Sequence, residues 1–145
     1  MEIKVKANFS HSIITELNYK TNESDVIELE SSEEVIFESI RGRTALHQDL
    51  EVCFVELITD INTTIDDNPN RSLELSMRFF FNLEIDNLEQ LSIEESEEKI
   101  MEELHTKTEQ SLMTFCRQQL RETIKQVTSI DNQGALITEG AVINF

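Results

Sequence analysis

The chain has 145 residues, which fits a single domain over 1–145, and its 12 Lys and Arg against 29 Asp and Glu give a net charge of −17. This acidity argues against binding to nucleic acid or to an anionic membrane surface, since both require clustered Lys and Arg. Leu, Ile, Val and Phe supply 45 residues, about 31% of the chain against roughly 20% in disordered chains, so a folded core is expected.

The N-terminal third contains several candidate strands. Residues 1–9 alternate between polar and apolar, a period of two that predicts a strand with one buried face. A second extended segment is expected over 12–20, and the acidic stretch 21–40 holds enough apolar residues for short strands. Arg-Gly-Arg at 41–43 is typical of a turn. The pairing of residues 12–48 within a sheet stays open.

The clearest strand pattern lies between residues 49 and 86. Apolar residues alternate over Leu50–Phe54 and then continue in the opposite phase over Val55–Ile61, which indicates either a bulge or a strand covered on both faces. A turn is expected at 66–70, in preference to a cation site built from its aspartates. Seven alternating apolar residues follow, from Leu73 to Ile85. The pattern therefore predicts an antiparallel hairpin of 49–65 and 72–86.

The period changes to that of a helix after residue 91. Ser92 and Glu95 form a capping box, and apolar residues then recur at spacings of mostly four as far as Val127. Because no Gly or Pro interrupts 92–129, the pattern predicts one helix of about 36 residues, near 54 Å at about 1.5 Å per residue. Strands followed by one long helix define an α+β class. The predicted helix is longer than a small sheet can cover. Its surplus apolar face is expected to pack against another copy of the chain, so we expect an oligomer.

No catalytic or metal-binding pattern is found in the chain. The three histidines are far apart, and the three glycines cannot form a phosphate-binding loop. Cys53 and Cys116 have no metal or redox spacing and sit among apolar residues, so we expect both in the core. The chain is therefore not expected to be an enzyme or to need a cofactor. With no signal-peptide pattern at 1–18 and no membrane-spanning run, we expect it to be cytoplasmic.

Apolar surface is the remaining functional signal. The run Phe79-Phe80-Phe81 places two rings on one face of its strand and one ring on the other. One interpretation is a sheet buried on both sides within an oligomer. The other is a groove for extended apolar peptide, with aromatic walls and adaptable methionines such as Met77 and Met113.

The order of hairpin, helix and short tail resembles the SecB-like chaperones of preprotein translocation. Leu112–Arg117 is similar to the Leu-Phe-Pro-Tyr-x-Arg segment of that family, Ile124–Thr128 to its Ile-x-x-Leu-Thr, and Ala141–Phe145 to its Pro-Pro-Ile-Asn-Phe. Thr114 stands where the family has Pro, and no second helix follows as it does in exporting members. The chain therefore resembles more closely the solitary relatives, some of which guard antitoxins or other specific clients.

The resemblance implies a four-stranded antiparallel sheet with the helix on one face, assembled as dimers of dimers. It implies an ATP-independent holdase that binds non-native polypeptide in apolar grooves, for export or for one client such as an antitoxin. The implied client-binding residues are Phe54, Phe80, Met113 and Phe115. An acidic sheet surface engages the translocation motor in exporting members, and its candidates here are Glu51, Glu56, Glu74 and Glu84.

Two other classes of protein remain open from the sequence. The charge of −17 suits an acidic inhibitor or decoy that occupies a basic, nucleic-acid-binding partner, with an affinity that falls steeply with salt. A structural assembly protein would instead use all of its aromatic surface as an oligomer interface.

Overall fold

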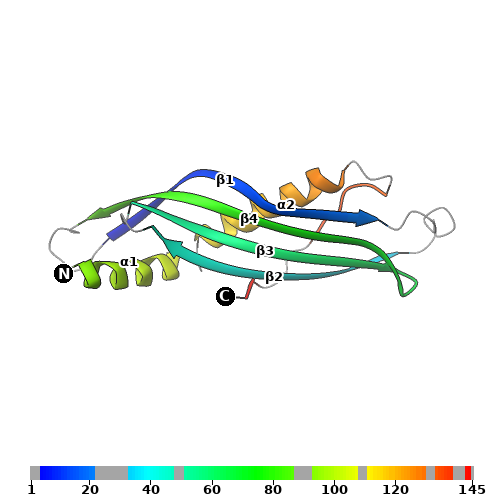
Figure 1. Ribbon diagram of the computed structural model, residues 1–145, viewed down its shortest axis with the longest axis horizontal. Helices are drawn as coiled ribbons and strands as arrows, with labels where there is room; N and C mark the ends of the chain where they lie inside the picture. Colours follow the sequence, from blue (N-terminus) through cyan, green and yellow to red (C-terminus); the bar gives the residue numbers. More distant parts are fainter. Residues whose placement is uncertain are drawn as a thin grey trace.

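Alternating apolar residues build a long, twisted sheet, and the helical segments cover one of its faces (Figure 1). The computed structural model describes residues 4–21, 33–47, 51–86, 93–107, 111–129, 133–138 and 143–144. The elements in chain order are β1 (Lys4–Thr21), β2 (Glu34–Leu46), β3 (Val52–Ile65), β4 (Asn68–Asp86), α1 (Ile93–Lys107), α2 (Met113–Thr128) and β5 (Ile143–Asn144).

The strands lie in the order β1-β4-β3-β2-β5, and the four long ones are antiparallel to their neighbours. The short β5 pairs in parallel with β2 and forms that edge of the sheet. The expected α+β class and the antiparallel four-stranded sheet are thus confirmed. The pairing that the sequence left open is also settled, because β1 lies against β4 and β2 lies against β3.

The predicted hairpin is formed by β3 and β4. Its turn is tighter than expected, since only Asp66 and Asp67 separate the strands and both have positive φ, 50° and 63°. Two consecutive left-handed residues make the tight turn whose twist matches that of paired strands. The register runs without a break from Val52 to Asn62, so the opposite phases of β3 reflect two occupied faces and no bulge between them.

Two N-terminal expectations are wrong. Residues 4–9 and 12–20 of the two predicted segments belong to one strand, β1, in which irregularities between Phe9 and His11 and between Ile14 and Glu16 shift the alternation. Each extra residue reverses the faces that follow it, which is why the sequence suggested separate segments. The Arg-Gly-Arg stretch 41–43 is no turn, because it lies inside β2 and pairs with β3. Residues 22–32 of the predicted acidic strand region lie outside the described residues.

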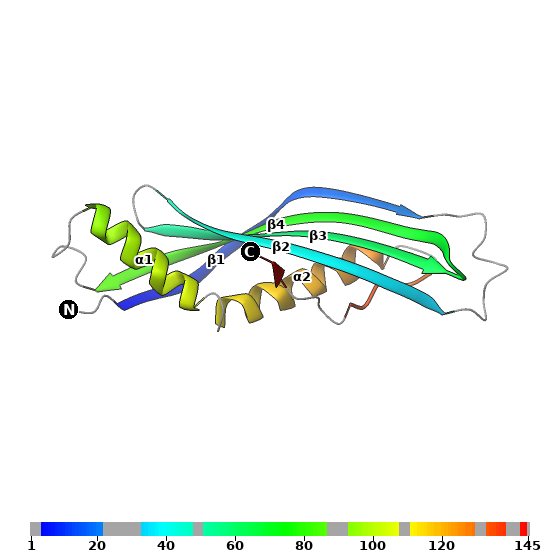
Figure 2. The same cartoon turned by 90° about the horizontal axis from the view of Figure 1, so that it is seen from below.

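The single predicted helix is also corrected, because α1 and α2 are separate helices that run in different directions across the sheet (Figure 2). At about 100° per residue, apolar residues spaced by four rotate by about 40° per step around a straight helix. Ile100 and Ile124 therefore cannot share one face of a straight helix, yet both are fully buried. Because α2 runs in a different direction from α1, the apolar side chains of both helices can face the sheet. The predicted cap Ser92 lies outside the described residues.

The core lies between the sheet and the two helices. On β3 and β4 the odd-numbered residues from Cys53 to Ile65 and from Leu73 to Phe81 point to this side, which we call the helix-side face, and the even-numbered ones point to the open face. The helices contribute to the same cluster with Ile100, Leu104, Leu112, Met113, Cys116, Leu120 and Ile124. The core placement predicted for both cysteines is confirmed.

The two thiols are expected to be unreactive in the folded protein. Burial raises the pKa of Cys53 to about 11 and that of Cys116 to about 12, so almost no thiolate is present near neutral pH. Labelling with a maleimide at pH 7.5 should be at least about 100-fold slower than in urea, because thiolate fraction and access are both suppressed. Mass spectrometry of timed samples checks this. Rapid labelling of either cysteine in the native protein would contradict it.

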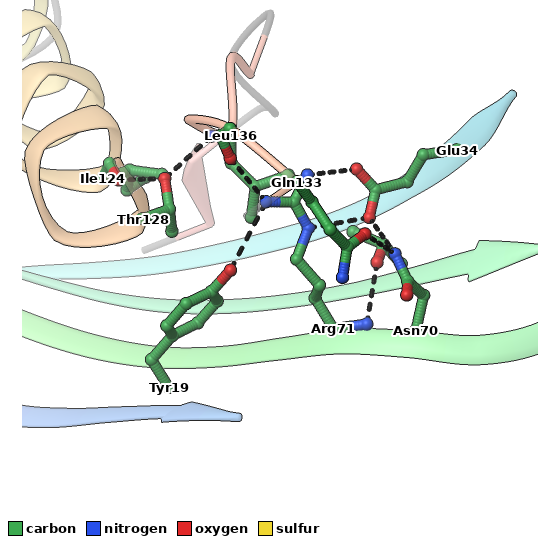
Figure 3. A network of polar contacts seen from close by, with 10 residues as sticks. Tyr19, Glu34, Asn70, Arg71, Ile124, Thr128, Gln133 and Leu136 are labelled. Atoms are coloured by element: carbon green, nitrogen blue, oxygen red, sulfur yellow. Dashed lines mark hydrogen bonds and ion pairs between the residues drawn. The ribbon is translucent and has the colours of Figure 1, made fainter. Parts of the chain in front are cut away.

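A polar network joins the end of the sheet near the β3–β4 turn to residues 133–138, which we call the C-terminal segment (Figure 3). The buried Arg71 donates from Nε to Glu34 Oε2 at 2.8 Å and from Nη2 to Glu34 Oε1. Its Nη1 donates to the Gly134 carbonyl at 2.8 Å and to the Tyr19 hydroxyl at 3.3 Å. One guanidinium on β4 therefore connects β1, β2 and the segment that follows α2.

Candidate functional site

Exposed apolar side chains gather on the helix-side face of β1. Phe9, Ile14 and Leu17 are 43%, 47% and 48% exposed, and the ring of Phe115 on α2 lies 4.7 Å from that of Phe9. We call these four residues the β1–α2 apolar strip. Apolar residues that are exposed singly need no explanation, but several on one face of a strand, interrupted between Phe9 and Ile14 by Ser12, indicate an interaction site.

The position of β1 at the edge of the sheet explains this exposure. Its three residues pair with Phe81, Met77 and Leu75 of β4, all of which are buried. The helices therefore cover this face of β4 and of the start of β1, where Val5 is buried, but leave it half open at Phe9, Ile14 and Leu17. The apolar strip is thus a part of the helix-side face that the helices do not cover.

The open face carries a different, mixed surface around Phe54 and Phe80. The two rings are 5.8 Å apart, and His11 of β1 stacks on Phe80 with ring centroids 4.7 Å apart. The guanidinium groups of Arg43 and Arg78 lie 5.4 Å and 4.9 Å from the centre of the Phe54 ring. These cation–π contacts and the stacked histidine make the aromatic pair half-buried and partly polar.

Glu56 holds the two arginines of the open face in place. Its carboxylate accepts from Arg43 Nε at 2.8 Å and from Arg78 Nε at 2.7 Å. Burial alone would raise the pKa of Glu56, but the hydrogen bonds and charges of Arg78 and Arg43 outweigh burial and lower it. The carboxylate is thus ionised and neutralised by its neighbours at neutral pH.

The structure does not bring the predicted client-binding residues together. Phe115 belongs to the apolar strip, whereas Phe54 and Phe80 lie on the opposite face of the sheet. Met113 is buried in the core and is only 7% exposed. Sequence reasoning missed Ile14 and Leu17, because the irregularities in β1 hide which of its residues share a face.

The predicted acidic docking residues are also dispersed. Glu74 and Glu84 are exposed on the open face of β4, and Glu51 is exposed immediately before β3. Glu56 is buried between two arginines, so it adds little free negative charge to this surface. The exposed acidic part of the open face is therefore smaller than the sequence suggests.

Neither a metal site nor a membrane span is evident in the part of the chain that the structure describes. Its His, Cys, Asp and Glu side chains form no group of three that could hold a metal ion. None of the helices described is long and apolar enough to cross a membrane.

Comparison with solved structures places this arrangement in a known class, the SecB-like chaperone fold. Over 94% of this chain and 91% of the other, the structure matches a Mycobacterium tuberculosis protein with a TM-score of 0.68 and 8% sequence identity. That protein is the Rv1957 SecB-like chaperone, in complex with a ChAD peptide from the Rv1956 HigA1 antitoxin. The likeness at this identity is one of fold.

A protein of unknown function from Streptococcus agalactiae also aligns, with a TM-score of 0.37 and 10% identity, over 97% of this chain and all of the other. No family model matches the sequence, and no curated protein does.

Proposed function

We propose that the protein is an ATP-independent chaperone of the SecB-like kind, which binds non-native polypeptide on its β1–α2 apolar strip. The observation that carries the proposal is the set of half-exposed Phe9, Ile14 and Leu17 on one face of β1, with Phe115 of α2 against Phe9. The fold, shared with a chaperone, supports a binding role over catalysis.

The strip suits an extended, apolar segment of a client. Burial of apolar surface contributes about 25 cal/mol per Å², so two or three client side chains give weak binding that favours unfolded over folded proteins. β1 is an edge strand, and within the described residues no strand pairs with its outer edge. A client segment alongside it would gain main-chain hydrogen bonds as well as apolar contacts.

We further propose that the chaperone serves one dedicated client. The structural neighbour is seen with a peptide from an antitoxin, which supports an antitoxin-type polypeptide as the client here. Such a client would be bound in the cytoplasm, before it folds or reaches its own partner. The role of an acidic decoy for a basic partner is favoured only by the charge of −17.

The salt dependence of client binding distinguishes a chaperone from an acidic decoy. We expect the purified protein to suppress aggregation of a chemically unfolded model protein without ATP, equally well at 50 mM and 500 mM salt, because apolar capture is not screened. Light scattering with a stoichiometric series measures this. Suppression lost at high salt would favour the decoy, and no suppression at either salt would overturn the general holdase.

We also expect the protein to self-associate. An 18-residue edge strand with apolar side chains on both faces, Ile14 on one and Ile13 on the other, is a liability unless another chain covers it. Sedimentation equilibrium should therefore give a mass at least twice that of one chain at micromolar concentration. A monomer at 50 μM would contradict this expectation.

A further inference from the structure

A second flank of α2, distinct from the one that carries Phe115, is basic. Arg117, Arg121 and Lys125 lie four residues apart and are three of only 12 basic residues in a chain with a net charge of −17. Together with Thr114, Gln118 and the C-terminal segment at Thr138, they line a pocket of about 410 Å³. A pocket of this size is in the range that accommodates a ligand.

Two buried polar atoms of residues that line this pocket lack a partner among the described residues. Thr138 is 97% buried, yet its Oγ1 has no hydrogen bond there, and Nε of Arg117 is likewise buried without an acceptor. Buried polar groups in folded proteins are nearly always satisfied, so unpaired donors beside a cationic row indicate a place for a ligand with acceptor oxygens. Glu122 also lines the pocket and its contact with Lys125 is exposed and 3.8 Å long, so the lining carries three cations against one carboxylate.

The spacing of the cations selects an extended polypeptide. Residues four apart on a helix are about 6 Å apart along its axis and about 40° apart around it, and alternate residues of an extended chain are about 6.6 Å apart. Carboxylates at alternate positions of such a segment therefore meet Arg117, Arg121 and Lys125 in turn, whereas one small oxyanion reaches only part of the row. The exposed Ile137 at the pocket offers apolar contact to the residues between them.

We propose that the pocket between α2 and the C-terminal segment binds an extended polypeptide with acidic residues at alternate positions. This site is separate from the β1–α2 apolar strip and does not depend on chaperone activity. A protein that binds such a peptide but does not suppress aggregation would keep this site and lose the function proposed above.

Fluorescence anisotropy with two labelled seven-residue peptides tests the proposal at 150 mM salt. One alternates Thr and Glu, and the other has the same composition with its three Glu contiguous. At this salt the Debye length is about 8 Å, so the pocket's cations act while the distant negative charge is screened. We expect the alternating peptide to bind at least threefold more tightly. Equal affinities for the two peptides would overturn the proposal.

Substitutions locate the binding on α2. The double variant Arg117→Gln and Arg121→Gln should weaken binding at least tenfold, and Thr138→Val about threefold, with unchanged circular dichroism. Arg41→Gln with Lys99→Gln removes the same charge from exposed positions elsewhere and should change affinity less than twofold. If the double variant does not fold, Lys125→Gln alone should still weaken binding about threefold. Binding unaffected by these changes, or full displacement by millimolar inorganic phosphate, would overturn the extended-peptide assignment.

Discussion

Replacing Arg71 by methionine is expected to lower the free energy of unfolding by roughly 3 kcal/mol, as loss of one partner of a buried ion pair does. The side chain is 4% exposed and donates to Glu34, to Tyr19 and to the Gly134 carbonyl, so its removal takes the cationic partner from Glu34 and a hydrogen bond from each of the other two. Methionine fills similar volume, which limits the cavity. Urea denaturation followed by circular dichroism measures the change.

The pH dependence of stability identifies the origin of this loss. Burial alone would raise the pKa of Glu34, but hydrogen bonds from Arg71, Thr63 and Asn70 and the charge of Arg71 lower it below 4.5. A depressed folded-state pKa gives stability that is present above the unfolded value and lost as the pH falls through the folded one. The wild-type protein should therefore lose stability below about pH 4.5, and its advantage over Arg71→Met should shrink there.

Arg78→Met is the matched control for Arg71→Met. It also removes an arginine that bonds a glutamate on the sheet, but Arg78 is 36% exposed and shares Glu56 with Arg43. Its loss should cost less than about 1 kcal/mol, as for exposed ion pairs. Equal losses for the two variants, or an Arg71→Met deficit that stays constant down to pH 3, would mean that the network does not stabilise the fold as described.

The sequence was sufficient for the fold class because its strongest pattern is local. The alternation from Leu73 to Ile85 specifies β4 and, with the turn at Asp66 and Asp67, the hairpin. The break between α1 and α2 was not visible, since neither Gly nor Pro marks it. The break follows from packing. Apolar residues spaced by four move gradually around a straight helix, so the helix must change direction to keep them against the sheet. The helix sequence does not encode where the sheet lies.

The candidate site was only partly predictable for a similar reason. Phe115 was found through its resemblance to a family motif, and the structure places it against Phe9. Ile14 and Leu17 are not distinguishable from core residues in the sequence. They are exposed because they lie on the edge strand at positions that the helices do not cover, whereas Val5 of the same strand is buried. Edge position and helix coverage are tertiary properties, so pattern analysis of β1 alone cannot predict them.

Replacing Ile14 and Leu17 together by threonine is expected to abolish most of the capture of unfolded polypeptide. Threonine keeps a high strand propensity but removes apolar area from two half-exposed positions of the strip. A loss of about 2 kcal/mol of binding free energy corresponds to roughly 30-fold in Kd. Because both side chains are surface positions, the stability should change by less than about 0.5 kcal/mol each. Anisotropy with a labelled, permanently unfolded peptide measures the affinity directly.

The matched control is Val35→Thr with Phe37→Thr, which removes apolar area from two residues of β2 that are 50% and 58% exposed on the open face. It should change the Kd less than twofold if capture belongs to the strip. Phe80→Asp tests the other aromatic surface, where His11 and Phe54 flank the ring. A strong loss with Phe80→Asp and none with the strip variant would move the client to the open face. The strip lies on the edge strand that is expected to self-associate, so each variant is also examined by sedimentation. An unchanged mass with weaker client binding means that binding surface was lost, whereas a changed mass means that the assembly was altered.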